Sequence, residues 1–443
     1  MKTNEFDGIV IIGAGLAGCE AAHQITKNNI KVRLYEMKPK KFTPAHKSNN
    51  LAELVCSNSL KSTSPEKASG ILKLEMQELD SLIIKAAHKS KLPAGGALAV
   101  DREQFSNYIT NEIRNNPLIE IINEEILSLP KELNSPLIVA TGPLTSEGLS
   151  RSIEIFIGQE NLSFYDSISP IIAYESLSNN HFFRASRYEE KEGDYINCPL
   201  DEEEYELFYK TLMNSERIEF HNFEKPNYFE GCLPIEVMAE RGVDTLRFGP
   251  MKPVGLIDPK TGKRPYSVVQ LRKENSHESM WNIVGFQTKM KIKDQKEVLS
   301  KIPALKNAEF LRFGSIHRNT YINSPGVISN TLQSNKNPLL FFAGQITGVE
   351  GYSESAAMGL VAGINSSRAF KNKKPIVFPT KSALGCLTNY ISDTSNKKIQ
   401  PMNINLGLFD IKKPKKNIDK IKKSSNECIL EIKNTNQIEL DLV

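Results

Sequence analysis

The start of the chain combines a strand pattern with a helix pattern. Residues 9–12 are apolar and mostly β-branched, which predicts a buried strand, and residues 16–27 are compatible with a helix. A second apolar run, residues 30–35, predicts another strand and ends in Glu36. Strand, helix and strand follow each other within the span of one βαβ unit, so we expect a parallel sheet here.

Helix and strand patterns continue beyond this unit. Apolar residues recur at helical spacing over residues 69–89, which predicts one long amphipathic helix. Residues 101–115 predict another helix, with Asp101 as a suitable N-cap. The runs 119–122 and 137–141 predict strands, and a tight turn follows the second. Such a turn at the carboxyl end of a parallel strand is where cofactors bind in open α/β sheets.

The middle of the chain has a different composition. From about residue 167 to residue 301 it is richer in aromatic residues, prolines and charges, and short strands alternate with short helices. A strand that runs into a glycine turn then returns at residues 341–348, and a helix of small residues follows at 354–367. The pattern predicts that the chain leaves its first domain, builds an inserted α/β domain and comes back.

The late glycine turn distinguishes between dinucleotides. A nicotinamide dehydrogenase does not need it, whereas the ring end of the longer FAD must be held by a segment distant in sequence from the adenine end. We therefore expect an α/β fold with a Rossmann-type, glutathione-reductase-like FAD-binding domain, interrupted by an inserted α/β domain. The expected boundaries are 1–166 and 305–407 for the two parts of the FAD-binding domain, 167–304 for the inserted domain and 408–443 for a basic, partly disordered tail.

The hydrophobic content and the cysteine spacing limit the classes of protein to which this chain can belong. The chain has 443 residues, 40% of them hydrophobic, and no apolar run approaches the ~20 residues that cross a bilayer. Because its start leads straight into the first strand, we expect no secretory peptide. The six cysteines are scattered without CxxC spacing, which favours the cytoplasm and argues against disulfides or a metal site.

The first glycine turn has the spacing of a dinucleotide-binding motif. Gly13 permits the tight turn, Gly15 lets the backbone approach a pyrophosphate, and Gly18 lets the helix pack close to the strand. The phosphates would lie at the helix N-terminus, and Glu36 would accept a hydrogen bond from a ribose hydroxyl. A turn that merely joins strand and helix is the alternative, but it leaves the acid unexplained. The candidate cofactor-binding residues are Gly13, Ala14, Gly15, Leu16, Ala17, Gly18, Glu36, Gly344, Gln345, Gly348 and Tyr352.

Two cysteines have the context of a reactive thiol. Cys56 lies among serines and an asparagine ahead of an expected helix, and Cys232 precedes Pro234, which suits the first turn of another helix. N–H groups at a helix N-terminus lower the pKa of a nearby thiol. For both residues the alternative is a small buried side chain, which is how free cysteine usually behaves. Cys19 lies inside the helix of the glycine motif and is expected in the core.

Basic residues are clustered more than the net charge of +4 implies. Cations with interleaved aromatic rings suit phosphate contacts and base stacking, although a solvated surface is the alternative and is favoured for the tail. The clusters are Lys260, Lys263, Arg264, Tyr266, Arg272 and Lys273, and in the tail Lys412, Lys413, Lys415, Lys416, Lys420, Lys422 and Lys423. Around His317 and Arg318, a polar cluster suits either an anionic or heterocyclic substrate or a loop cap.

Several long blocks resemble one family. The blocks are residues 13–18, 35–39, 52–60, 93–102, 229–242, 317–320 and 343–352. Together they resemble the folate- and FAD-dependent RNA uracil-C5 methyltransferases known as TrmFO, from the start of the chain to about residue 407. The flavoproteins that modify the wobble uridine of tRNA share the glycine motifs but are not similar around Cys232.

The resemblance implies a reaction for these residues. In this family methylenetetrahydrofolate supplies the carbon, reduced FAD carries it and supplies the electrons, and NADH or NADPH reduces the flavin. By that analogy Cys232 adds to C6 of uracil and Cys56 removes the C5 proton, while His317 and Tyr352 sandwich the pterin or the flavin ring. The substrate-binding candidates, with the inserted domain facing the RNA, are Arg264, Tyr266, Arg272, His317 and Arg318.

The sequence leaves two RNAs as alternative substrates and two other classes of function as alternatives to methylation. In family members, a phenylalanine-glycine-leucine-phenylalanine-proline segment follows the residues that correspond to 401–403. This chain has a different sequence there, at residues 404–410. We expect the T-loop uracil of tRNA as the substrate, with a uracil of large-subunit (23S) ribosomal RNA as the alternative. The other classes are a flavin oxidoreductase of a small metabolite and a non-enzymatic RNA-binding flavoprotein.

Overall fold

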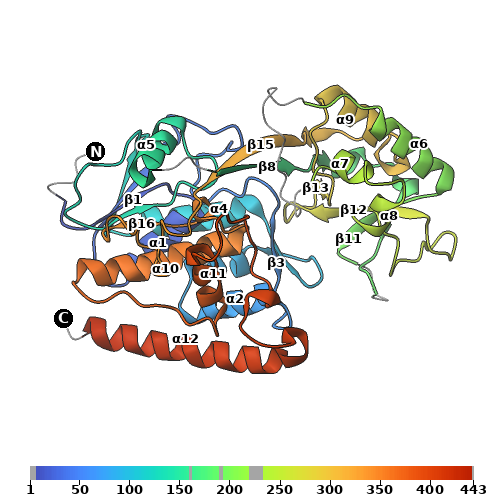
Figure 1. The fold of residues 1–443 in the computed structure, drawn as a ribbon. Coiled ribbons are helices and arrows are strands. Elements are labelled where there is room, and N and C mark those ends of the chain that lie inside the picture. Colours follow the sequence, from blue (N-terminus) through green and yellow to red (C-terminus); the bar gives the residue numbers. More distant parts are fainter. Residues whose placement is uncertain (1–5, 159–161, 189–192, 219–232, 442–443) are drawn as a thin grey trace.

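The protein has two lobes that are joined by a pair of strands (Figure 1). The computed structural model describes residues 6–158, 162–188, 193–218 and 233–441, and it places the side chains in these ranges except at 162–168, 317–318 and 436–441. The joining strands are β8 (Leu162–Ile168) and β15 (Ser315–Tyr321), which pair antiparallel along their whole length. The chain therefore leaves and re-enters the first lobe side by side.

The first lobe is built on a five-stranded parallel sheet in the order β16-β7-β1-β2-β6. The strands are β1 (Ile9–Ile12), β2 (Val32–Glu36), β6 (Ile119–Asn123), β7 (Leu137–Val139) and β16 (Leu340–Phe342). The late strand β16 pairs with β7, so the predicted return of the chain to its first sheet is confirmed. A parallel sheet of this kind places its ligand at the carboxyl ends of the strands.

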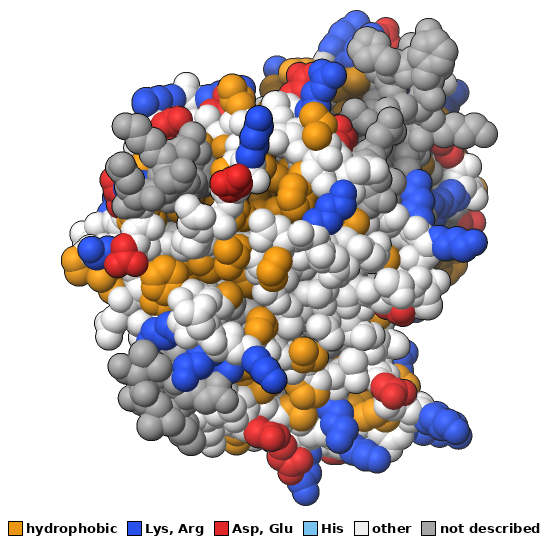
Figure 2. All heavy atoms as spheres, turned by 60° about the vertical axis from the view of Figure 1, so that its left-hand side comes forward, with side chains coloured by type: hydrophobic (Ala, Val, Ile, Leu, Met, Phe, Trp, Pro, Cys, Tyr) orange, Lys and Arg blue, Asp and Glu red, His pale blue; other side chains and the backbone are white. Residues whose placement is uncertain are grey.

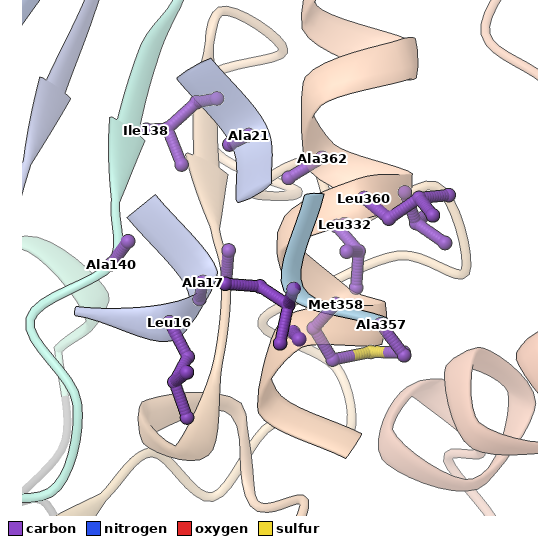
Figure 3. Close-up of a cluster of buried hydrophobic side chains, with 14 of the residues drawn as sticks. Leu16, Ala17, Ala21, Ile138, Ala140, Leu332, Ala357, Met358, Leu360 and Ala362 are labelled. Atoms are coloured by element: carbon purple, nitrogen blue, oxygen red, sulfur yellow. The ribbon is translucent and has the colours of Figure 1, made fainter. Parts of the chain in front are cut away.

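Helices α1 (Leu16–Thr26) and α10 (Tyr352–Phe370) come from opposite ends of the lobe's sequence and pack against each other. Figure 3 shows Ala21 of α1 beside Ala362 of α10. The approach is so close that a Cβ built at Gly359 would lie 2.2 Å from the backbone oxygen of Ala17. Glycine at this position is therefore a steric requirement of the helix pair.

The predicted single helix over residues 69–89 is wrong, because the structure has two helices there. The first, α2, ends at Glu78, and Asp80 then adopts a left-handed φ of 60°. Ser81 caps the next helix by accepting a hydrogen bond from the Ile84 N–H at 3.2 Å. Polar capping residues interrupted a continuous apolar pattern, which periodicity alone did not reveal.

The other elements of the first lobe cover the sheet or extend it. The cap that the sequence predicted for α4 is confirmed, since the Asp101 carboxylate accepts from the Glu103 and Gln104 N–H groups. The helices are α2 (Ala68–Glu78), α3 (Leu82–Lys89), α4 (Arg102–Arg114), α5 (Glu147–Ile157), α11 (Ala383–Ser392), η5 (Gln345–Thr347), η6 (Leu406–Leu408) and η7 (Pro414–Asn417). A small antiparallel sheet has the order β3 (Ser59–Ser62), β5 (Ala97–Val100), β4 (Lys91–Leu92).

The second lobe contains a six-stranded antiparallel sheet in the order β10-β11-β12-β13-β9-β14. Its core is aromatic and aliphatic, with Trp281, Phe208 and Phe286 fully buried. The strands are β9 (Ile171–Ala173), β10 (Phe183–Arg184), β11 (Tyr195–Leu200), β12 (Ser267–Lys273), β13 (Met280–Ile283) and β14 (Phe310–Arg312). The helices are α6 (Glu202–Met213), α7 (Ile235–Ala239), α8 (Thr245–Phe248), α9 (Ile292–Leu299), η1 (Tyr174–Ser176), η2 (Asn179–His181) and η4 (Pro303–Leu305). The boundaries at 166 and 304 stay predictions; β14 adds to this sheet although it follows residue 304.

The C-terminal tail differs from the predicted partial disorder, because the structure has helix α12 at Ile418–Asp441. Ile421, Ile429 and Ile432 are buried on one face of α12, which packs against α2. The Ser425 hydroxyl donates to Glu75 at 2.6 Å, and Glu75 also accepts from the first N–H groups of α11. The abundance of lysine concealed this apolar stripe in the sequence.

Substitution of Gly359 by alanine tests the packing of α1 on α10. The added methyl group has to separate the two helices, so we expect Gly359→Ala to lower the free energy of unfolding by about 1–3 kcal/mol in urea titrations. Gly96→Ala is the control, because no atom of the described residues lies within 4 Å of a Cβ built there. Equal stability of the two variants would contradict the steric role of Gly359.

The buried Glu75 predicts a pH dependence of stability. Burial raises the pKa of its carboxyl to about 7, against the hydrogen bonds from Ser425, Ala383 and Leu384 that favour the charged form. Because this pKa lies above its value in the unfolded chain, the contribution of Glu75 is full at about pH 4 and is lost as the pH rises through 7. Urea unfolding at pH 5.5 and pH 8 should show a larger loss of stability for the wild type than for Glu75→Gln. The same loss in both proteins would refute the assignment.

Candidate active site

A cleft of about 1110 Å³ opens at the carboxyl ends of the parallel strands. Its floor is the turn between β1 and α1, where Gly13 has a φ of 100° and a Cβ would lie 2.6 Å from the oxygen of Ala140. A Cβ at Gly18 would lie 1.8 Å from the oxygen of Gly13, so the turn is closed by backbone contact. At Gly15, the N-cap of α1, no atom of the described residues lies within 4 Å of such a Cβ. The backbone of Gly15 is therefore open to a ligand.

Glu36 lies at the end of β2 and is buried beside this turn. Its carboxylate accepts from the Ala14 N–H at 3.0 Å and from the Lys38 N–H at 2.9 Å. Ala14, Leu16 and Ala17 line the cleft with it. A carboxylate has about four acceptor positions, so Glu36 can receive further donors from a ligand.

The late glycine turn lies beside the first and also lines the cleft, since a Cβ built at Gly344 would lie 2.9 Å from Cβ of Ala17. Gly344 has a φ of 82° and lines the cleft together with Gln345 and Tyr352, the first residue of α10. Gly348 has a φ of 91° and lies elsewhere, because a Cβ there would meet the side chain of Ile399 at 2.4 Å. The structure thus brings the two predicted glycine turns together and places Gly348 behind the wall, as a turn residue.

A second cavity of about 1320 Å³ adjoins the first and lies between the lobes. The two share wall residues, Tyr352 and Gln345 among them, so they are neighbours at that point. Cys56 lines the second cavity from the first lobe, and Arg272 and Asn282 line it from the second. Cys56 therefore lies in the cavity that adjoins the first cleft.

The structural context of Cys56 is not the one that the sequence predicted. Strand β3 follows the residue, and the next helix, α2, begins only at Ala68. Instead the Cys56 N–H donates to the Tyr352 hydroxyl at 2.7 Å, and the Cys56 carbonyl accepts from Arg102 at 2.7 Å. Burial opposes the charge of Arg102, but Glu274 overcomes it and holds the pKa of the guanidinium above its ordinary value.

The basic and aromatic residues predicted to face the RNA do not form one surface. Arg264 is exposed, whereas Tyr266 is half-buried, with the guanidinium of Arg247 3.6 Å from the centre of its ring. Arg272 is buried, and its Nε donates to the Asn58 side chain at 2.9 Å. Burial lowers the pKa of Arg272, and Glu274 opposes that effect. Arg272 thus belongs to the second cavity and Arg264 to the outer surface.

For three predicted site residues, the residue or its side chain is not among those that the structure describes. Cys232 lies outside the described residues, and so do the side chains of His317 and Arg318, whose backbone belongs to β15. The described chain resumes at Leu233, and the Ile235 N–H donates to the carbonyl of Gln287, which lines the second cavity.

Four residues near the site had no predicted role. His46 lines the first cleft, where burial first and then Lys38 lower its pKa. Asn58, Arg102 and Glu274 surround the Cys56 segment, and only the first two fell within blocks that resembled a family. No spacing pattern points to Glu274. Cys19, by contrast, is fully buried as predicted, and burial raises the pKa of its thiol.

No helix in the described part of the chain has the length and apolar character needed to span a membrane. The family described as "Glucose inhibited division protein A" matches residues 8–374. In solved structures, GidA of Aquifex aeolicus superposes with a TM-score of 0.69 at 18% identity, covering 100% of this chain and 77% of that one, which shows a shared fold.

Two relatives at higher identity carry the same name. The methylenetetrahydrofolate–tRNA-(uracil-5-)-methyltransferase TrmFO of Acetivibrio thermocellus is 55% identical over 404 residues, 91% of this chain and 92% of the relative. That of Listeria innocua is 54% identical over 399 residues, 90% of this chain and 91% of the relative. Identity at this level over nearly the whole length shows that the chain belongs to the TrmFO family.

Proposed function

We propose that this chain methylates C5 of a uracil in tRNA, with methylenetetrahydrofolate as the carbon donor and FAD as its cofactor. Membership of the TrmFO family supports the reaction. The observation that carries the proposal is that the cleft formed by two glycine turns adjoins, at Tyr352, a cavity lined by Cys56. A cleft that fits a dinucleotide and the thiol proposed as the base are thus neighbours.

The residues of the first cleft fit FAD. The open backbone of Gly15 at the N-terminus of α1 would take the pyrophosphate, where N–H groups and the helix dipole favour negative charge. Glu36 would accept from the ribose, and Gly344, Gln345 and Tyr352 would hold the ring end. FAD held by these residues would supply the electrons and the means of one-carbon transfer, with NADH or NADPH as its reductant.

The two cysteines have different roles in the reaction of the uracil. Uracil C5 is a poor nucleophile, and addition of the Cys232 thiolate to C6 makes C5 enolate-like, so that it can attack the one-carbon electrophile. Cys56 then takes the proton from C5, which lets the bond between the one-carbon unit and its carrier break. A hydride, which reduced FAD would supply, completes the methyl group, and elimination of the Cys232 thiolate restores the ring. His317 and Tyr352 would sandwich the pterin or the flavin ring, and Gly348 would shape the turn behind it.

The RNA has to present an unstacked base to a site enclosed by two lobes. Arg264, Tyr266 and Arg318 would contact the RNA around the target base, and Arg272 the base within the cavity. Figure 2 shows the side of the molecule that is on the left in Figure 1, and there the lysines and arginines are dispersed rather than gathered into one patch. We infer recognition by a few placed contacts rather than by a broad basic surface. The cytoplasm holds tRNA, folate and reduced nicotinamide, and we propose it as the location.

The comparisons give no support to 23S ribosomal RNA as the substrate, to oxidation of a small metabolite or to binding without turnover. The relatives carry the name of a tRNA methyltransferase. The departure at residues 404–410 begins next to Asn403, which lines the second cavity, and continues through η6 toward η7. We therefore keep the T-loop uracil of tRNA as the proposed substrate.

A tRNA T-arm hairpin carrying 5-fluorouracil at the target position tests the two cysteine roles. Fluorine at C5 cannot be removed as a proton is, so the wild type, supplied with methylenetetrahydrofolate and NADH, should form a covalent complex visible on a denaturing gel. Cys232→Ala should form none. Cys56→Ala should still form it, yet turn over a normal hairpin about a hundred-fold more slowly.

Cys428→Ala, which changes a cysteine of α12 far from the cavities, is the matched control and should behave as the wild type. A covalent complex that persists in Cys232→Ala would assign the addition to another residue.

Substitution of Gly15 by alanine tests the FAD site. The methyl group has room in the protein, so the fold should stay stable within about 1 kcal/mol, but it would occupy the approach of the pyrophosphate. We expect the Kd for FAD, measured by quenching of flavin fluorescence, to rise about ten-fold or more, which is a loss of at least 1.4 kcal/mol. Gly96→Ala serves again as the control. An unchanged Kd would place the pyrophosphate elsewhere.

A further inference from the structure

The backbone of Cys56 is held by hydrogen bonds on both of its polar groups. Its N–H donates to the Tyr352 hydroxyl at 2.7 Å, which fixes it to the first turn of α10. Its carbonyl accepts from Nη2 of Arg102 at 2.7 Å, and Nη1 of Arg102 donates to the carbonyl of Leu54. A single guanidinium therefore spans the turn of chain that presents Cys56.

The same guanidinium connects this turn to the second lobe. Arg102 forms a two-pronged ion pair with Glu274, through Nε to one carboxylate oxygen and through Nη2 to the other at 3.2 Å. Glu274 directly follows β12 and has only 2% of its surface exposed. A buried carboxylate with such a partner is held in one geometry, because any other leaves a charge unpaired.

Asn58 makes a second connection to the same strand end. Its amide donates to the carbonyl of Lys273 at 2.7 Å and to that of Val100 at 3.0 Å, and its oxygen accepts from Nε of Arg272 at 2.9 Å. Asn58 is fully buried. Three consecutive residues of the second lobe, from Arg272 to Glu274, are thus joined to the segment that carries Cys56.

We propose that Arg102, Glu274 and Asn58 are positioning residues for Cys56, and that they fix its place relative to the second lobe as well as to Tyr352. The proposal rests on the role given above to Cys56 as the base. A general base has to stand within hydrogen-bond reach of the proton it removes, and displacement of about 1 Å can cost a hundred-fold in rate. Cys56 belongs to the first lobe, and the RNA is proposed to bind mainly to the second, so the reaction needs such a connection between the lobes.

Glu274→Gln tests the proposal, because it keeps the size of the side chain but turns one of its two acceptors into a donor that faces Arg102. In FAD-loaded protein we expect kcat for a T-arm hairpin to fall about ten-fold or more, with KM for the RNA and the visible flavin spectrum unchanged. Alkylation of Cys56 by iodoacetamide, followed by mass spectrometry of its peptide, should become about five-fold faster as the turn loosens. Glu274→Asp, which retains the charge, should recover most of the rate.

Glu120→Gln is the matched control, since it removes the carboxylate of another Arg–Glu pair, with Arg33, on the edge of the first lobe. If Glu274→Gln does not fold, Asn58→Ala carries the same expectations. Wild-type alkylation and kcat in Glu274→Gln or Asn58→Ala would overturn the proposal. The assigned role of Cys56 has its own test: if Cys56→Ala retains full turnover, that role fails while the alkylation result stands.

Discussion

The close packing of α1 on α10 is the constraint on which the rest of the site depends. Each helix starts at a glycine turn, and the strands before these turns lie in the same parallel sheet. Because Gly359 lets the backbones approach to contact, the two turns lie side by side and line a single cleft. Segments from opposite ends of the sequence can therefore hold the two ends of one long cofactor.

From this pair of helices, hydrogen bonds and an ion pair connect the site to the second lobe. Tyr352 opens α10 and accepts the N–H of Cys56, Arg102 fixes the carbonyl, and Glu274 continues the connection to β12. Buried ion pairs of this kind add little stability compared with apolar packing. The ion pair between Arg102 and Glu274 instead fixes an arrangement. It joins the turn that carries Cys56 to both lobes, beside the cavity that would receive the base.

The sequence predicted what depends on local pattern. The βαβ unit, the return of the chain at β16 and the Asp101 cap each follow from a few neighbouring residues. It did not predict the break at Asp80, where polar capping overrides a continuous apolar period, or helix α12, whose buried isoleucines are diluted by lysine. It also did not predict strand β3, which pairs with β5 and separates Cys56 from the helix expected after it.

The candidate site was predictable only in part, for the same reason. The glycine turns carry their own steric signature, so Gly13, Gly15 and Gly344 were found from spacing. Glu274 carries none, since its importance arises from a partner far away in sequence. Arg272 was grouped with Arg264 because they are close in sequence, although only Arg264 is exposed and Arg272 is buried in the cavity wall.

The most direct measurement is the transfer of labelled carbon from methylenetetrahydrofolate to separate tRNA and 23S ribosomal RNA transcripts, with NADH and FAD-loaded protein. The account predicts that label enters the tRNA, at C5 of the T-loop uracil, and does not enter the ribosomal RNA. Label in the ribosomal RNA alone, or in neither RNA from a protein that binds flavin, would contradict it.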